Sequence, residues 1–183
     1  MSTIWRNIFY VVTSPKFGWE EIEQSNIPVG KVLRTVYVPL LFVLAISCFV
    51  PRLYDSTVTV YSSFMEGVVL FWSFFIAYFI IIYIIGCSYQ ELVKTEGGSA
   101  RLNDYILYNL IFLVMLMILR HLLPTDFTPV LFLLLYLPWM AYKGVDHLYI
   151  KREKAVRFVI ISSVLVLGVP FVLQLIFGLF IIK

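Results

Sequence analysis

The chain has 183 residues and a net charge of +3, with 61% hydrophobic and only 14% charged residues. Soluble domains carry about 45–50% apolar and about 25% charged residues. The composition therefore excludes a protein that folds in water alone, and the mean hydropathy of +0.93 indicates that the lipid bilayer is its main solvent.

The first predicted element is an amphipathic helix over residues 3–13. At about 100° per residue, apolar side chains gather on one side of this helix and polar side chains on the other. The apolar side consists of Ile4, Trp5, Ile8, Phe9, Val11 and Val12. The polar side consists of Thr3, Arg6, Asn7, Tyr10 and Thr13. We expect this helix to lie in the membrane interface, with Trp5 and Phe9 reaching the acyl boundary.

A second short helix is expected before the first membrane span. It begins at Pro15, which suits a first helical turn, and Ser14 is expected to cap it. The preceding apolar stretch is interrupted by Arg6 and Asn7 and is not followed by a small-residue cleavage site. We therefore expect no cleaved signal peptide, so that the first span acts as the targeting signal.

Five stretches that are almost free of charged residues predict five transmembrane helices, because a helix needs about 20 mainly apolar residues to cross the hydrocarbon. The expected spans cover residues 35–51, 67–90, 105–121, 127–142 and 158–182. Residues 1–34 then form a cytoplasmic segment of interfacial helices, and residues 35–183 form the transmembrane domain.

Three of these spans are short, but flanking basic side chains can reach the interface and extend them. These side chains are Arg34, Arg52, Arg120 and Lys143. An alternative for the third and fourth spans is a re-entrant hairpin that turns at Leu123–Asp126.

The distribution of lysine and arginine predicts the orientation. With five spans and a cytoplasmic N-terminus, residues 1–34, 91–104 and 143–157 lie in the cytoplasm and hold eleven of the fourteen basic residues. Positively charged loops favour the cytoplasmic side. We therefore expect an inner-membrane protein with its N-terminus inside and its C-terminus outside.

The residues that most often bind metals or form disulfides are few and separated in this topology. Cys48 and Cys87 fall near opposite faces of the membrane, so they should remain unbridged. His121 and His147 also fall near opposite faces and cannot share a metal. We expect no metal site and no cofactor.

Catalytic motifs are also missing from the sequence. It contains no His-Glu-x-x-His, no Gly-x-Ser-x-Gly and no Gly-x-x-x-x-Gly-Lys pattern. Asp104 and Asp146 both fall on the cytoplasmic side, but neither lies inside its span, so helix capping or boundary placement explains them better than an aspartyl pair. The sequence therefore predicts a non-enzymatic protein.

Two polar residues lie deepest within the predicted spans, Asn109 and Gln174. Such residues can line a substrate path, but they more often form hydrogen bonds that pack helices together. We interpret both as packing residues. Pro39, Pro138 and the Gly168–Pro170 run should kink their helices.

The candidate contact surface for partners or lipids is cytoplasmic. It combines residues of the second helix with the basic connector before the last span. Its members are Trp19, Glu20, Glu21, Lys143, Lys151, Arg152 and Lys154. The basic members fit the topology signal, and each would also attract anionic lipid headgroups by about 1 kcal/mol.

Three stretches together resemble the bacterial branch of the Yip family, the Ypt/Rab-interacting membrane proteins. Residues Thr13–Ile22 resemble its Pro-x-x-x-Trp-x-x-Ile entry, and Glu96–Ser99 resembles its Gly-Gly loop. The Gly144–Val145 turn, with Leu148 and Lys154 beyond it, is similar to its connector before the last span. The similarity runs from about residue 10 to the end.

The resemblance implies the same five-span topology with the N-terminus inside. Eukaryotic relatives are linked to Rab GTPases and vesicle traffic, but the family assigns no catalytic residue to this chain. One departure is that members often carry a proline in the third span, whereas residues 105–119 contain none.

We therefore expect an all-α membrane protein with five transmembrane helices preceded by short interfacial amphipathic helices. The leading functional hypothesis is a non-enzymatic scaffold or organiser that binds membrane lipids, other membrane proteins or further copies of itself, and no nucleic acid. The alternative is a transporter or channel for small solutes or ions, with Asn109 and Gln174 lining the path. An intramembrane enzyme ranks third.

Overall fold

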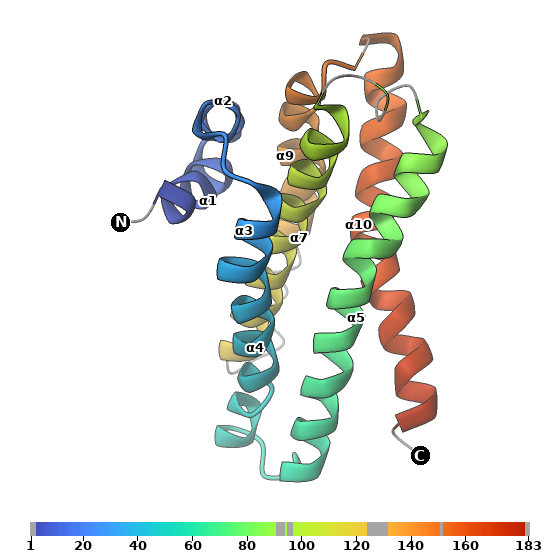
Figure 1. Ribbon diagram of the computed structural model, residues 1–183. Helices are drawn as coiled ribbons and strands as arrows, with labels where there is room; N and C mark the ends of the chain where they lie inside the picture. Colours follow the sequence, from blue (N-terminus) through green and yellow to red (C-terminus); the bar gives the residue numbers. More distant parts are fainter. Residues whose placement is uncertain (1–2, 91–93, 95–96, 124–131, 151, 182–183) are drawn as a thin grey trace.

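The structure, a computed structural model, describes residues 3–90, 94, 97–123, 132–150 and 152–181 (Figure 1). Every regular element in these ranges is helical, so the expected all-α fold is confirmed. Long helices lie side by side in a bundle, and a short helical hairpin sits beside one end of it (Figure 1).

The two ends of the bundle carry different groups of polar residues. We call the end beside the N-terminal helices the hairpin end; it contains Trp19, Tyr105 and His147. We call the opposite end the far end; it contains Cys48 and His121.

The N-terminal hairpin consists of α1 (Thr3–Thr13) and α2 (Pro15–Ser25). The predicted start of α2 is confirmed, although the side chain of Ser14 does not cap it. The two helices approach closely at Gly18, where a Cβ atom would lie 2.3 Å from the backbone nitrogen of Val11. Only glycine allows this approach.

The apolar side chains of α1 face two different surroundings. The buried stripe consists of Ile4, Ile8 and Val11. Trp5 and Phe9 are instead exposed, by 46% and 56%. Asn7, on the predicted polar side, is fully buried, and its Nδ2 donates a 3.0 Å hydrogen bond to Ser25 Oγ. Packing against the bundle, as well as amphipathicity, therefore determines how α1 is rotated.

The first membrane-length helix changes its hydrogen-bond pattern along its length. It comprises α3 (Val29–Val32), the π-helical turn η1 (Leu33–Tyr37), α4 (Val38–Ser47) and the 3₁₀ turn η2 (Val50–Leu53). Pro39 lies in the first turn of α4, where it has no N–H to donate and its ring would clash with a regular preceding turn. The wider π turn directly before it accommodates the proline.

The other long helices are α5 (Val60–Ser88), α7 (Gly98–Leu122) and α10 (Arg152–Ile181). A capping box begins α5: Thr59 Oγ1 accepts from the Ser62 N–H and Ser62 Oγ accepts from the Thr59 N–H, both at 3.1 Å. Both α5 and α7 begin earlier than the predicted spans, because charged residues near a helix end do not stop the helix.

Four helical stretches in the described part of the chain are long and apolar enough to cross a membrane. They are Val29–Leu53, Val60–Ser88, Gly98–Leu122 and Glu153–Phe180. The third is the central one, since 72% of its most apolar window is buried, against 28–44% for the others. The protein is therefore membrane-embedded, with α7 at the centre of the bundle.

The predicted span 127–142 is described only in its second half. This half consists of the 3₁₀ turn η3 (Leu133–Leu135) and α9 (Tyr136–Gly144), which are too short to count as a membrane-length helix. Residues 124–131, and with them the turn of the alternative re-entrant hairpin, lie outside the described residues. The fourth predicted span, and with it the count of five, thus remains a prediction.

The contact between α4 and α5 yields a first prediction. At Gly67 a Cβ atom would lie 2.8 Å from the backbone oxygen of Ala45, which cannot move without shifting α4. Gly67→Ala should therefore destabilise the bundle by about 1–3 kcal/mol, measured as a lower SDS fraction at the unfolding midpoint in mixed micelles. Gly168→Ala is the matched control, because nothing lies within 4 Å of that position. Equal midpoints for both variants would contradict the close helix contact.

Candidate functional site

Trp19 holds the N-terminal hairpin on the bundle, and its side chain is only 2% exposed. Its indole Nε1–H donates a 3.1 Å hydrogen bond to the backbone oxygen of Met140 in α9. The ring stacks on Tyr105 of α7 and on His147, with centroid distances of 5.7 Å and 5.8 Å. Tyr108 meets the indole edge-on at 6.1 Å. We call Trp19, Tyr105, Tyr108 and His147 the Trp19 cluster.

A glycine makes room for this cluster. At Gly144, the last residue of α9, a Cβ atom would lie 2.7 Å from Cε2 of Trp19 and 2.9 Å from Cε2 of Tyr105. A further hydrogen bond joins the hairpin to α9, since the hydroxyl of Tyr136 donates to the backbone oxygen of Val12 at 2.8 Å. The hairpin is therefore fixed to the bundle by both ring packing and hydrogen bonds.

Polar side chains surround the cluster on one side. Glu23 of α2 accepts a 2.6 Å hydrogen bond from the hydroxyl of Tyr149, and its other carboxylate oxygen lies 3.6 Å from Nδ1 of His147. The guanidinium of Arg101 lies over the ring of Tyr149, 4.5 Å from the centroid. We call Glu23, Arg101, His147 and Tyr149 the polar rim. His147 belongs to both groups because it contacts both Trp19 and Glu23. It lies in the 3₁₀ turn η4 (Asp146–Leu148).

The polar rim determines the charges at the hairpin end. The hydrogen bond from Tyr149 is the main cause that lowers the pKa of Glu23 below its ordinary value of 4.5, and the same bond raises the pKa of Tyr149. Burial lowers the pKa of His147 below 6.5, although the Glu23 carboxylate opposes this shift. Glu23 is therefore charged and His147 neutral at neutral pH. This arrangement positions the helix hairpin on the bundle.

The three candidate contact residues of α2 have different surroundings. Trp19 is buried in its cluster and does not present its ring to a partner. Glu20 is exposed, and Glu21 forms an ion pair with Arg6 of α1. Only the two glutamates of the three therefore lie at the surface.

The basic candidates lie where α9 ends and α10 begins. Lys143 is half-buried, with its ammonium 4.6 Å from the ring centroid of Trp139. Lys154 is exposed on the first turn of α10, and Arg152 is the residue at which this helix begins. Lys151 lies outside the described residues. Lys143 and Glu20 thus belong to the same end of the bundle, because α2 and α9 meet through Trp19.

The two intramembrane candidates do not meet through a hydrogen bond. Asn109 is fully buried on α7, and its Nδ2 donates a 2.7 Å hydrogen bond to the backbone oxygen of Tyr105 in the same helix. Gln174 is half-buried on α10, and its Nε2 has no hydrogen-bond partner among the described residues. An interhelical polar bond in the described bundle instead joins the hydroxyls of Tyr105 and Ser162 at 2.9 Å.

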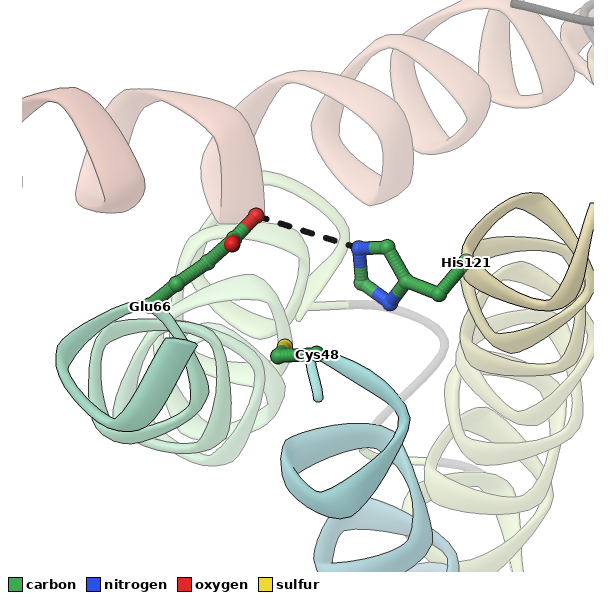
Figure 2. A group of neighbouring side chains, drawn as sticks. All are labelled: Cys48, Glu66 and His121. Atoms are coloured by element: carbon green, nitrogen blue, oxygen red, sulfur yellow. Dashed lines mark ion pairs between the residues drawn. The ribbon is translucent and has the colours of Figure 1, made fainter. Parts of the chain in front are cut away.

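The far end carries a cluster that the sequence reasoning missed. Cys48, Glu66 and His121 come from three different helical segments and point toward one another (Figure 2). Each lies near the outer end of a predicted span. The predicted topology therefore already places all three near the same face of the membrane. Both cysteines are free, as expected.

The separation of the two histidines is also as expected. His147 reaches Tyr105 through Trp19, and His121 is 16 residues further along α7, which corresponds to about 24 Å at 1.5 Å per residue. They cannot share a metal ion.

No family model, curated protein or solved structure matches this chain.

The glycine beside Trp19 yields a second prediction. Gly144→Ala should force the buried indole or Tyr105 to move and weaken the docking of the hairpin by about 1–3 kcal/mol, as overpacking does elsewhere. Faster hydrogen exchange of the α2 amides in detergent micelles measures this loss. Gly30→Ala should leave the exchange unchanged, since nothing lies within 4 Å of Gly30. Unchanged exchange in Gly144→Ala would show that the indole is not held as described.

The polar rim yields a third prediction, which concerns pH. Because the pKa of His147 is lower in the docked hairpin than the ordinary 6.5, the undocked state binds more protons below that pH. Docking should be complete above pH 6.5 and weaken as the pH falls, by at most about 1.4 kcal/mol per pH unit. Arg101 reinforces the shift and Glu23 opposes it.

Fluorescence of Trp19 can measure this weakening in a chain whose other tryptophans are replaced by phenylalanine. The emission maximum should move to longer wavelength between pH 6.5 and pH 5, and His147→Gln should remove the movement. A shift of equal size in both chains would assign the pH dependence to another group.

Proposed function

We propose that this chain is a non-enzymatic membrane scaffold, similar to bacterial Yip proteins, that binds partners at a cytoplasmic face built on the docked hairpin. The observation that carries the proposal is the fixation of α1 and α2 by the buried Trp19. A hairpin held in one orientation presents its exposed residues with little loss of conformational freedom on binding. Such preorganisation suits a docking surface.

Five membrane crossings are part of the proposal. Besides the four membrane-length stretches, the positions of α7 and α9 support a further crossing. The last turn of α7 contains His121, beside Cys48 at the far end. α9 ends at Gly144, beside Trp19 at the hairpin end. These two positions support a return along the bundle before α10, and with it termini on opposite sides of the membrane.

The cytoplasmic assignment of the hairpin end follows from the basic residues. The predicted inner segments hold eleven of the fourteen lysines and arginines, and positive charge favours the cytoplasm. In this orientation α1 lies in the inner interface. Its exposed Trp5 and Phe9, together with Phe17 of α2, supply apolar and aromatic contacts with lipid.

The docking surface itself combines charges of both signs. Glu20 is exposed on α2, Lys143 lies in the last turn of α9, and Lys154 lies in the first turn of α10. Mixed charge of this kind gives orientation and specificity to a protein contact more than it gives affinity. A protein partner, or a second copy of the chain, fits this surface better than an anionic lipid alone, because an acidic side chain repels anionic headgroups.

The transporter alternative gains little support from the bundle. A solute path needs polar side chains near the membrane centre that can replace lost water. Asn109 uses its amide N–H on its own helix, and no hydrogen bond joins it to Gln174 in the described bundle. We therefore assign both to packing.

Photo-crosslinking tests the proposal in native membranes. A photoreactive amino acid at Glu20 or at Lys143 should give discrete protein adducts, whereas the same group at Ser56, exposed beyond the far end, should not give these adducts. The adducts should weaken several-fold in Gly144→Ala, because the hairpin is then loosened.

Two outcomes would contradict the scaffold. One is adduct formation at Glu20 that is no greater than at Ser56 and is indifferent to Gly144→Ala. The other is a saturable solute flux in liposomes that Asn109→Leu abolishes while the chain stays folded, which would favour the transporter.

A further inference from the structure

Three metal-binding side chains converge at the far end of the bundle. Cys48 follows the last turn of α4, Glu66 lies in the second turn of α5, and His121 lies in the last turn of α7 (Figure 2). One ligand atom from each residue lies within 4.8 Å of the other two. Cys48 and His121 are buried, and the side chain of Glu66 is 51% exposed.

A neighbouring serine orients the imidazole. The hydroxyl of Ser47 donates its one hydrogen to the backbone oxygen of Leu44 at 2.7 Å, so it accepts the 2.9 Å hydrogen bond that it shares with Nδ1 of His121. Nδ1 therefore carries the proton, and the lone pair of the neutral ring lies on Nε2. This is the second interaction that metal-binding histidines commonly make.

The carboxylate of Glu66 faces this lone pair. Its Oε1 lies 3.9 Å from Nε2 of His121 (Figure 2). Two acceptor atoms that face each other at this distance repel unless a proton or a cation lies between them. Among the described ion pairs, Glu66 is paired with this histidine and not with the neighbouring Arg120.

The separations suit a small tetrahedral ion. With Zn–N and Zn–O bonds of about 2.0–2.2 Å and Zn–S bonds of about 2.3 Å, ligand atoms of a tetrahedral site lie about 3.4–3.6 Å apart. From separations of up to 4.8 Å, the three atoms need to close by at most about 1.4 Å to reach this geometry. Side-chain rotation of the partly exposed Glu66 can bring its carboxylate closer to the other two atoms.

We propose that Cys48, Glu66 and His121 form a Zn²⁺ site at the far end of the bundle, outside the scaffold surface and independent of it. The ion forms one bond each to Sγ, a carboxylate oxygen and Nε2, and the thiol proton of Cys48 passes to solvent. A water molecule takes the fourth position. A mixed sulfur, nitrogen and oxygen set favours Zn²⁺ over Mg²⁺ and Ca²⁺, which prefer oxygen ligands alone.

The exposure of Glu66 and the position of the site between three helical segments determine how the ion enters and what its binding stabilises. The half-exposed Glu66 provides a route for the ion from the surface, whereas Cys48 and His121 are buried. Binding joins segments α4, α5 and α7, which carry most of the buried core. The bound ion therefore stabilises the bundle and makes its stability depend on the zinc concentration outside.

Metal titration of the purified full-length chain tests the proposal. The chain carries no histidine tag, and Zn²⁺ or Co²⁺ is the only ligand added, in micelles at neutral pH. We expect one equivalent to bind, a sulfur-to-cobalt charge-transfer band in the near ultraviolet with Co²⁺, and a higher unfolding temperature with Zn²⁺ but not with Mg²⁺.

Variants assign the ligands. Cys48→Ser should abolish the charge-transfer band, and Glu66→Gln or His121→Gln should weaken binding more than Ser47→Ala. Loss of Ser47, which only positions the ring, should cost about 10-fold in affinity. Cys87→Ser and His147→Gln are the matched controls and should bind as the unchanged chain does. Each variant is first shown to keep the elution volume of the folded protein.

The proposal is overturned if the unchanged chain binds less than a tenth of an equivalent, or if Cys48→Ser keeps the cobalt band and affinity. It is also overturned if Cys87→Ser or His147→Gln weakens binding as much as His121→Gln. None of these results bears on the scaffold, whose residues lie at the hairpin end.

Discussion

The packing of one indole determines how the hairpin end is built. Trp19 occupies a space that four residues of α7, α9 and η4 leave for it: Gly144 provides the room, Tyr105 and His147 provide ring faces, and Met140 provides a carbonyl. Because a buried indole N–H without a partner is costly, the ring has one favourable position. The orientation of α2, and through Gly18 that of α1, follows from this position.

The same packing explains why the N-terminal helices differ from a simple interfacial pair. The sequence pattern identified α1 as amphipathic and located the start of α2, because hydrophobic periodicity and a proline at the first turn are local signals. The rotation of α1 is not local. The burial of Asn7 depends on a hydrogen bond with Ser25, which only the folded hairpin brings near.

The long helices show a similar division between local and distant information. Four of the predicted apolar stretches correspond to membrane-length helices, but the observed helices extend beyond the predicted ends. The capping box at Thr59 begins α5 earlier than predicted, and charged residues next to the apolar stretches are part of the helices. The cluster of Cys48, Glu66 and His121 could not be read from spacing, since 18 and 55 residues separate its members. It is visible only when three helix ends are placed at one side of the membrane.

The contacts of the hairpin join residues near the N-terminus to residues that the ribosome adds much later. Trp19 bonds a residue 121 positions away, and Tyr149 reaches Glu23 across 126 positions. During synthesis the N-terminal segment thus lacks its full docking site until α9 and the turn after it have left the ribosome. Until then α1 and α2 can pack on each other and on Tyr105 of α7, without the hydrogen bond that Met140 provides. A docked hairpin consequently marks a chain whose synthesis has passed the turn after α9, whereas a chain that stops earlier lacks the residues that hold Trp19.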